Sequence, residues 1–265
     1  MKKVSLVRET TYDDAIMGNI WIKVFILIGL VSLRSLPVKS SQCIMMGMCD
    51  QAAFGHIPCV HSGPPQALSD EAARSTLKEI CPHLAGEASL CCTPEQIEDL
   101  KSHTELFGLF LKACPSCFAN YQKLLCHLTC SPSQSDFMKI LRKQTSEDGK
   151  EEVLEVDVFL HSSFATGFYD SCKNITRFNE RVIDVFCKPW GADKCTPERL
   201  MKYLGSDYGH IGHSPYQIDY VLDTADSHKL YDETFQVTKL PATACSESAN
   251  GQPACACEHC PAACG

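Results

Sequence analysis

All eighteen cysteines of this chain lie downstream of one short apolar segment. The segment is Trp21–Leu33, the first cysteine is Cys43 and the last is Cys264. Disulfides form and persist in oxidising compartments such as the secretory pathway. An even number of cysteines after such a segment therefore predicts a luminal or secreted chain that disulfides cross-link.

The apolar segment is shorter than the ~20 residues that a membrane-spanning helix requires. Its length and the three basic residues before it are typical of a secretory signal. We expect residues 1–40 to be a signal peptide with its flanking region, and residues 41–265 to be a luminal cysteine-rich domain. A non-cleaved anchor is the alternative. Because the chain stops at Gly265 without a tail, we expect it to be part of a longer membrane protein.

The charge of the chain is acidic. The net charge is −8, and removal of residues 1–41, with six basic and three acidic side chains, changes it to −11. Such a domain, with no basic patch, does not favour nucleic acid or anionic membrane surfaces as partners. The remaining ~220 residues are enough for one hydrophobic core.

Capping signals predict several helices between residues 68 and 142. Thr93-Pro94-Glu95-Gln96 combines a capping residue, proline at the first helical position and glutamine at the third. Asp70 and Pro115 mark the starts of two further helices. Ser131-Pro132-Ser133-Gln134 repeats the capping pattern and predicts a helix through Leu141. The polar stretch 143–152 indicates a surface loop.

The second half of the chain mixes both periodicities. Alternating apolar residues predict strands over 153–160, 218–222 and 235–237. Helical spacing returns at 164–172 and 182–186, and Thr196-Pro197 opens another helix. From Ala244 the chain is cysteine-dense, so that only cross-links can hold it. The patterns predict an α+β, helix-rich, disulfide-stapled domain with a small sheet.

Two cysteine motifs raise the possibility of redox activity or metal binding. Cys114-Pro115-Ser116-Cys117 has the spacing of a redox pair at a helix start. The cysteine-rich stretch from Cys255 to Cys264 has the spacing of a zinc or iron–sulfur site. In an oxidising lumen, structural disulfides are the better interpretation of both.

Secreted phospholipases have a Cys-Cys doublet beside a catalytic histidine. In this chain Thr93 directly follows the doublet Cys91-Cys92, so that histidine is missing. Since no nucleophile with its base is visible either, we expect no enzymatic activity, no metal and no cofactor.

A non-enzymatic ligand pocket needs only an apolar lining and one or two fixed polar groups. Gln96 is such a group, because its amide both donates and accepts hydrogen bonds, although it also fits the capping pattern from Thr93. Met45 and Met48 suit either an irregular apolar ligand or a core. Asn174-Ile175-Thr176 is a glycosylation sequon, with Asn174 as the acceptor.

The cysteine string and several short motifs carry a resemblance to a known family. The matching motifs are Cys43-x5-Cys49, Ser62-Gly63-Pro64-Pro65, Leu90-Cys91-Cys92, Cys114-Pro115-Ser116-Cys117-Phe118, Leu128-Thr129-Cys130-Ser131-Pro132, Tyr169-Asp170-Ser171-Cys172 and Cys255-x-Cys257-x2-Cys260-x3-Cys264-Gly265. They cover nearly all of 43–265. The chain resembles the N-terminal luminal domain of the Niemann–Pick type C family of large transmembrane proteins, which includes an intestinal cholesterol-uptake relative.

The resemblance implies an α+β fold with helices around a small mixed sheet and nine disulfides. The implied pairs are Cys43–Cys91, Cys49–Cys59, Cys81–Cys126, Cys92–Cys130, Cys114–Cys255, Cys117–Cys172, Cys187–Cys195, Cys245–Cys260 and Cys257–Cys264.

The resemblance also implies a sterol site. Gln96 matches the family's glutamine that hydrogen-bonds the sterol hydroxyl. The remaining implied site positions are pocket-side Leu100, Leu125 and Thr129, and mouth-side Val185, Phe186, Pro215 and Tyr216. Three positions depart from the family: Met45 replaces its tryptophan, Met48 its acidic residue and Pro58 its asparagine. We expect one end of the pocket to be more apolar than in the family.

The resemblance thus predicts non-enzymatic binding of cholesterol or a related sterol, for intracellular or intestinal transport towards a membrane. It implies a small soluble sterol carrier as a partner, and an endosomal, lysosomal or extracellular location. The alternatives are a cysteine-rich receptor module for another small lipid or vitamin, and a secreted disulfide-active or hydrolytic enzyme.

Overall fold

The computed structural model describes residues 40–177, 179–207 and 210–264. Contacts divide the chain into Met1–Ser40 and Ser41–Gly265, and the elements below belong to the second unit. The expected signal region, apart from Ser40, lies outside the described residues. Within the described ranges, no helix combines the length and apolarity needed to cross a membrane.

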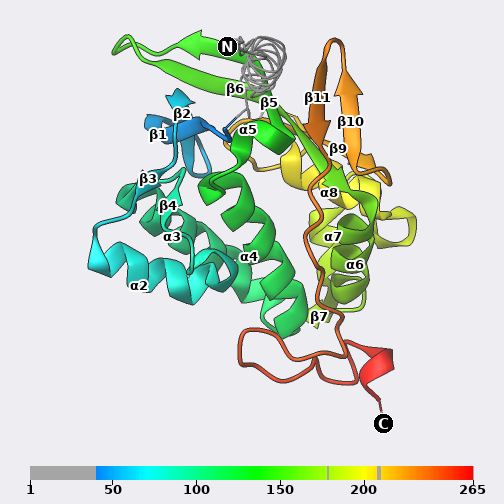
Figure 1. The fold of residues 1–265 in the computed structure, drawn as a ribbon. Coiled ribbons are helices and arrows are strands. Elements are labelled where there is room, and N and C mark those ends of the chain that lie inside the picture. The colour runs from blue at the N-terminus through cyan, green and yellow to red at the C-terminus, as the bar shows by residue number, and fades with distance from the viewer. Residues whose placement is uncertain (1–39, 178, 208–209, 265) are drawn as a thin grey trace, which may run out of the picture. The chain divides into compact units, whose positions relative to one another are not determined.

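Both helices and strands occur along the second unit (Figure 1). The strands are β1 (Cys43–Gln51), β2 (His56–Gly63), β3 (Gln66–Ala67), β4 (Ser89–Leu90), β5 (Met138–Thr145), β6 (Glu151–His161), β7 (Thr176–Arg177), β8 (Glu180–Arg181), β9 (Gln217–Asp223), β10 (Ser227–Leu230) and β11 (Glu233–Gln236). The α-helices are α2 (Glu71–Ile80), α3 (Pro94–Leu111), α4 (Pro115–Cys130), α5 (Gln134–Phe137), α6 (Ser162–Cys172), α7 (Val182–Phe186) and α8 (Pro197–Gly205). Short 3-10 turns are η1 (Pro82–Leu84), η2 (Ala192–Lys194) and η3 (Pro261–Ala263).

The main sheet is mixed and is built around β6. β5 pairs with β6 antiparallel along most of one edge. The other edge is shared: Cys59 of β2 pairs antiparallel opposite Glu152, and β9 runs parallel beside Glu155–His161. β1 extends the sheet by pairing antiparallel with β2. The α+β fold with a small mixed sheet, predicted from the sequence, is confirmed.

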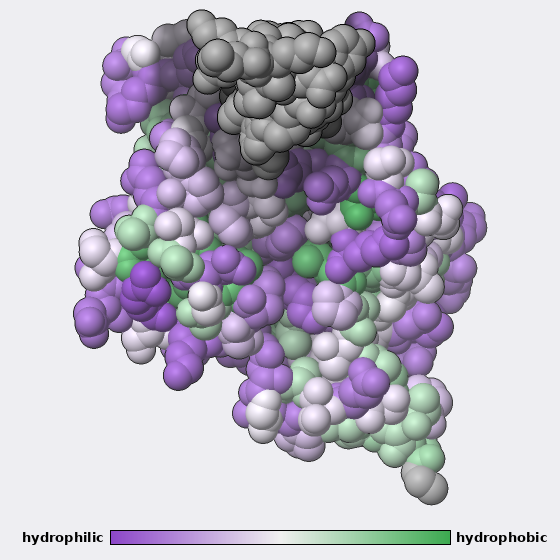
Figure 2. Space-filling view, viewed as in Figure 1, coloured by the Kyte–Doolittle hydropathy of each residue, from purple (hydrophilic) through white to green (hydrophobic). Residues whose placement is uncertain are grey.

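The helices pack in a series, α2 on α3, α3 on α4, α4 on α6 and α6 on α8. Helix α4 has buried residues at most positions of its length, because neighbours cover it on several sides. Fully buried Phe164 and Phe168 of α6 belong to the larger core, whereas Leu77 of α2 and Ile97 of α3 belong to a second one. On the face seen in Figure 2, hydrophobic residues of the described chain form small areas among hydrophilic ones.

The predicted helix starts are confirmed where a side chain caps the backbone. The Ala73 N–H donates to Asp70 Oδ1 at 2.7 Å at the start of α2. At α3, the Gln96 N–H donates to Thr93 Oγ1 while Thr93 N–H donates back to Gln96 Oε1, so the capping box is complete. The Arg199 N–H donates to Thr196 Oγ1 before α8. These local signals are strong because each satisfies an N–H that the helix leaves unpaired.

The predicted helix through Leu141 is wrong. Helix α5 ends at Phe137, and Met138–Thr145 form a strand that pairs with β6. No side chain caps α5: Ser131 Oγ accepts from the Ser133 N–H, and the amide of Gln134 is bound to the backbone of other elements. The predicted loop over 143–152 is correspondingly shorter, since both of its ends belong to the β5–β6 hairpin.

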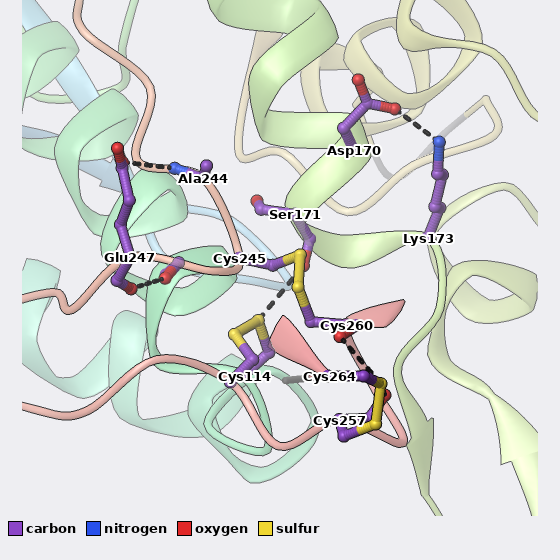
Figure 3. The surroundings of a disulfide bond; sticks show 12 residues. Cys114, Asp170, Ser171, Lys173, Ala244, Cys245, Glu247, Cys257, Cys260 and Cys264 are labelled. Carbon is purple, nitrogen blue, oxygen red and sulfur yellow. Dashed lines mark hydrogen bonds and ion pairs between the residues drawn. A yellow bond between two sulfur atoms is a disulfide. The ribbon is translucent and has the colours of Figure 1, made fainter. Parts of the chain in front are cut away.

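The nine disulfides join the same pairs as those implied by the resemblance. Cys114 is bonded to Cys255 and Cys117 to Cys172, so the redox motif does not close on itself. Figure 3 shows the C-terminal segment, where Cys245–Cys260 and Cys257–Cys264 lie close to Cys114. Beyond β11, the 3-10 turn η3 is the one helical element in the described part of this segment, so disulfides hold it in place of regular structure.

Candidate ligand cavity

A cavity lies between helices α3 and α4 on one side and strands β1, β2 and β9 on the other. Its empty volume is about 1060 Å³, part of it open to solvent. Apolar atoms make up most of its lining surface, and its fully apolar side chains are Met45, Met48, Pro58, Leu100, Phe107, Leu124, Leu125, Leu128, Leu204, Pro215 and Ile218.

Helix α3 contributes one face to the cavity. Gln96, Leu100, His103 and Phe107 all line it. They follow one another at intervals of four, three and four residues, which places them along one stripe of a helix. At 1.5 Å per residue, Gln96 and Phe107 are roughly 16 Å apart along the axis. The cavity is therefore elongated along α3.

Helix α4 follows α3 after a short turn and contributes Tyr121, Leu125 and Thr129 to the same cavity. The rings of Phe107 and Tyr121 are 5.5 Å apart between centroids. Thus Tyr121, in the first half of α4, lies at the Phe107 end. Thr129, about 12 Å further along α4, lies towards the other end, where α3 begins.

Strands complete the opposite wall. Met48 and Pro58 face each other in the β1–β2 pair, and Met45 is buried beside them. A shift of register between Met45 and Met48 marks a bulge, and Gly47 within it has a φ of +83°. Glycine adopts this backbone conformation without strain. The bulge directs the Gly47 N–H towards α3.

The amide of Gln96 is held in one orientation. Its Oε1 accepts a hydrogen bond from Gly47 N–H at 2.7 Å and another from Thr93 N–H at 3.1 Å. Because both bonds require an oxygen, the nitrogen Nε2 takes the other position. Within the described residues Nε2 makes no hydrogen bond, so Gln96 offers a ligand two N–H donors. Gln96 is thus both a capping residue and a free donor.

The second amide of the cavity is saturated. Gln134 Oε1 accepts from the N–H groups of Ile44 and Met45 at 3.0 and 3.1 Å. Its Nε2 donates to the carbonyls of Leu128 and Thr129 at 3.0 and 3.1 Å. All four hydrogen-bonding positions of the amide are used, and they join β1 to the end of α4. Gln134 has nothing left for a ligand.

Charged groups line the middle of the cavity. His56 Nδ1 lies 2.7 Å from Asp99 Oδ1, and both side chains are about one-third exposed. His103 lies one turn beyond Asp99, and burial lowers its pKa although the charge of Asp99 opposes the shift. This favours a neutral imidazole on the cavity wall. The turn at Gly55 packs near Asp99, His103 and Pro215, so the β1–β2 turn and the segment before β9 meet on this side of the cavity.

Three tyrosines line the Phe107 end. Tyr121 is 3% exposed, whereas Tyr216 and Tyr220 are half-buried. Burial raises the pKa of all three phenols, and at Tyr121 and Tyr220 a neighbouring tyrosine adds to the effect. The phenols therefore stay protonated and neutral.

The structure brings most of the implied site residues together. The cavity is lined by Gln96, Leu100, Leu125, Thr129, Met45, Met48, Pro58, Pro215 and Tyr216. Val185 and Phe186 do not line it: Val185 is 39% exposed, and Phe186 is buried. The ring of Phe186 lies 5.8 Å from that of Phe107, so it supports the wall from behind. Asn174 is exposed beside β7, and its glycosylation stays a prediction.

Several lining residues were not singled out from the sequence, although a signal existed for most of them. His103 and Phe107 continue the helical stripe of Gln96. Tyr121 precedes Leu125 by one turn of α4. Tyr220 is two residues beyond Ile218 on β9 and so lies on the same face of the strand. No local signal identifies Gln134, because its role depends on the meeting of β1 with α4.

All eighteen cysteines are in disulfides. Among the described residues, no group of three or more metal-binding side chains could hold a metal ion.

Comparison with known proteins identifies similar chains. The family model described as the Niemann-Pick C1 N terminus matches residues 40–265. The chain is 30% identical over 249 residues to "NPC intracellular cholesterol transporter 1" of Sus scrofa, covering 89% of this chain and 19% of the relative. It is 30% identical over 240 residues to "NPC intracellular cholesterol transporter 1 homolog 1" of Caenorhabditis elegans, covering 82% and 17%. It is 27% identical over 217 residues to the human "NPC1-like intracellular cholesterol transporter 1", covering 80% and 16%. The chain thus spans less than a fifth of the length of these relatives.

Proposed function

The chain belongs to the family of the Niemann-Pick C1 N terminus, and from this membership together with its cavity we propose that it binds cholesterol or a related sterol without catalysing a reaction. The relatives named above are called cholesterol transporters. The chain corresponds to one domain of proteins of that length. We therefore place it as the luminal sterol-binding part of a larger membrane protein, in an endosome, a lysosome or at the cell exterior.

The observation that carries the proposal is an elongated apolar cavity with one oriented amide donor at its end. Apolar burial contributes about 25 cal/mol per Å², before the cost of association, so the hydrocarbon body of a sterol dominates its affinity. One hydrogen bond adds only about 1 kcal/mol net. Gln96 then orients the ligand, with Nε2 donating to the oxygen of the sterol hydroxyl.

Pro58, which stands where the family has an asparagine, affects which sterols bind at this end of the cavity. Pro58 is buried opposite Met48 and has neither a polar side chain nor a backbone N–H. A ligand oxygen near Gln96 therefore meets no polar side chain at position 58, whereas an asparagine there would offer one. We propose that the site tolerates sterols modified at the hydroxyl end, or other flat apolar lipids.

Transfer of the sterol requires an opening in the cavity. Pro215 lies beside Gly55 at the turn between β1 and β2, and Tyr216 follows it in the lining. We place the entrance between these two segments, with delivery from a small soluble sterol carrier and onward passage towards the membrane.

Equilibrium binding of radiolabelled cholesterol to the purified chain tests the role of Gln96. We expect Gln96→Ala to weaken binding about fivefold and to reduce discrimination between a hydroxyl and its methyl ether, since one donor is lost. Gln96→Glu is the matched control for the helix cap, because a carboxylate still accepts from Gly47 and Thr93. Unchanged affinity and selectivity in Gln96→Ala would reject the role.

A competition series tests the selectivity. Cholesterol, a plant sterol and a 3-sulfated sterol compete for the same labelled ligand. We expect all three to compete; a strict preference for a free hydroxyl would contradict the effect assigned to Pro58.

A further inference from the structure

A groove that shares no residue with the ligand cavity lies between the end of α6 and the C-terminal segment. Its empty volume is about 830 Å³, part of it open to solvent. One side is formed by Gly167, Asp170 and Lys173, and the other by residues within 242–246 and 261–262. Figure 3 shows Asp170 and Lys173 at the end of α6, together with the C-terminal segment.

Asn174 lines the same groove and is the acceptor of the one glycosylation sequon in the sequence. It is exposed in the turn after α6, and Thr176, the third residue of the sequon, is exposed as well. Between them Ile175 is fully buried, and its N–H donates to the carbonyl of Cys172 at 3.1 Å. The turn is thus anchored by Ile175, while the acceptor stays at the surface, as a bulky and hydrated sugar chain requires.

The lining of the groove suits a sugar ring. Most of its surface is apolar and comes from small residues, such as Gly167, Ala242 and Ala262. Polar groups lie at its edge: Lys173 Nζ is 2.7 Å from Asp170 Oδ1, so the two charges compensate each other. A sugar carries hydrogens bound to carbon on its faces and hydroxyls around its rim. It can therefore pack on the small apolar side chains and form hydrogen bonds at the edge of the groove.

The C-terminal side of the groove has few backbone hydrogen bonds of its own. Asn120 of α4 binds the backbone of Thr243 through both ends of its amide, at 2.8 and 2.9 Å. Within the described residues the N–H groups of Cys245 and Ser246 make no hydrogen bond, and the disulfide Cys245–Cys260 holds this part of the chain. A layer that covers 242–246 would therefore shield amides that the fold leaves open.

We propose that Asn174 carries an N-linked glycan whose first sugars lie in this groove and cover the C-terminal segment at 242–246. The bond forms between Nδ2 of Asn174 and the first carbon of a sugar chain supplied on a lipid diphosphate; the lipid diphosphate leaves, and the amide loses one proton. Because the sugars are tethered at the groove itself, their effective concentration there is high, and weak contacts suffice to hold them. The inference rests on the luminal location in the proposed function, and not on the sterol.

Expression of the full chain in cultured animal cells tests the attachment. Intact mass before and after treatment with peptide-N-glycosidase should show one glycan on the wild type. Thr176→Ala, which removes the sequon but keeps Asn174, should carry none. A chain that enters the secretory pathway without a glycan overturns this inference and leaves the luminal location standing. A chain that remains in the cytosol overturns both.

Hydrogen exchange of the amides in 242–247 tests the position of the sugars. We expect exchange to be roughly threefold or more slower in the glycosylated chain than in Thr176→Ala. The matched control adds Glu87→Asn to Thr176→Ala, which creates a sequon with Ala88 and Ser89 at an exposed position outside the groove. A glycan there should leave exchange in 242–247 as fast as in Thr176→Ala. Equal exchange with and without the glycan on Asn174, or the same slowing from the displaced glycan, would overturn its placement in the groove.

Discussion

The two ends of the cavity differ in how far the protein satisfies its own polar groups. At the end where α3 begins, Gln134 uses all of its hydrogen-bonding positions on the backbone, and Gln96 keeps only its Nε2 donors. At the other end, the hydroxyls of Tyr121 and Tyr220 have no partner among the described residues. The type of a polar side chain alone therefore does not show whether it binds a ligand. A buried polar group whose partners are all protein atoms supports the fold, and one without partners is available for binding.

The two walls differ in their cross-links as well. The α3–α4 wall is held by Cys81–Cys126 and Cys92–Cys130. In the opposite wall, Cys49–Cys59 joins β1 to β2, whereas β9 lies between Cys195 and Cys245, with no cysteine between these two in the sequence. The α3–α4 wall is thus covalently fixed, whereas β9 in the opposite wall is held by strand pairing and packing alone. This contrast supports an entrance on the β9 side.

The largest expected effect concerns the cross-linked wall. Replacing both Cys92 and Cys130 by alanine should lower the free energy of unfolding by about 4 kcal/mol, because the disulfide closes a loop of 38 residues in the unfolded chain. Removing Cys257–Cys264, which closes only 7 residues, should cost about 2 kcal/mol. Urea unfolding of the oxidised proteins measures both. Equal losses would show that the fixed wall is no more dependent on its disulfide than the C-terminal segment.

A smaller loss is expected for the saturated amide. Gln134→Leu should lower the free energy of unfolding by about 3 kcal/mol, because backbone groups of Ile44, Met45 and Leu128 lose their partner in a buried site. Gln66→Leu, at an exposed position, is the control. Thermal and urea unfolding compare the two variants. If Gln134→Leu is no less stable than the control, its assignment as a structural group is wrong.

The fixed wall also carries a pH dependence. His127 of α4 stacks on Phe137 at 4.4 Å, and burial, with a smaller contribution from the charge of His83, lowers its pKa to about 4. In the unfolded chain the imidazole of His127 takes up a proton near pH 6.5, whereas in the folded chain it stays neutral down to about pH 4. The contribution of His127 to the free energy of unfolding is therefore fully present above pH 6.5 and falls as the pH drops towards 4. We expect a loss of about 2 kcal/mol between pH 7 and pH 5 from this group. His127→Phe should flatten the pH profile of urea unfolding, and an unchanged profile would contradict the burial effect.

The smallest effect concerns the apolar substitution near Gln96. Pro58→Asn adds a polar side chain opposite Met48. We expect it to increase the preference for a free hydroxyl over a 3-sulfate by about fivefold, the effect of one added hydrogen bond. Competition binding on wild type and variant measures this ratio. If the ratio does not change, Pro58 does not set selectivity.

The sequence predicted the parts of the fold that depend on neighbours along the chain. The capped starts of α2, α3 and α8 are such parts, since one side chain and the next few N–H groups decide them. The helix through Leu141 was wrong because the amide of Gln134 binds distant backbone groups and β6 pairs with the residues that follow. β1 and β2 were missed, since bulges interrupt the alternation of their side chains.

The site was predictable to a similar extent. Helical spacing places Tyr121 on the same face of α4 as Leu125, and strand alternation places Tyr220 on the same face of β9 as Ile218. The sequence cannot say which polar groups have partners, because those contacts join residues far apart, such as Gly47 and Gln96. The disulfide pairs came from the resemblance, since spacing alone leaves many connectivities open.

Native mass spectrometry of the purified chain incubated with cholesterol measures whether the cavity holds one sterol. We expect one sterol mass per chain in the wild type and none in Leu125→Trp, whose larger ring fills the middle of the cavity. Thermal unfolding of the variant verifies that it remains folded. A wild-type chain without bound sterol, or a folded Leu125→Trp variant that binds as much as the wild type, would contradict sterol binding in this cavity.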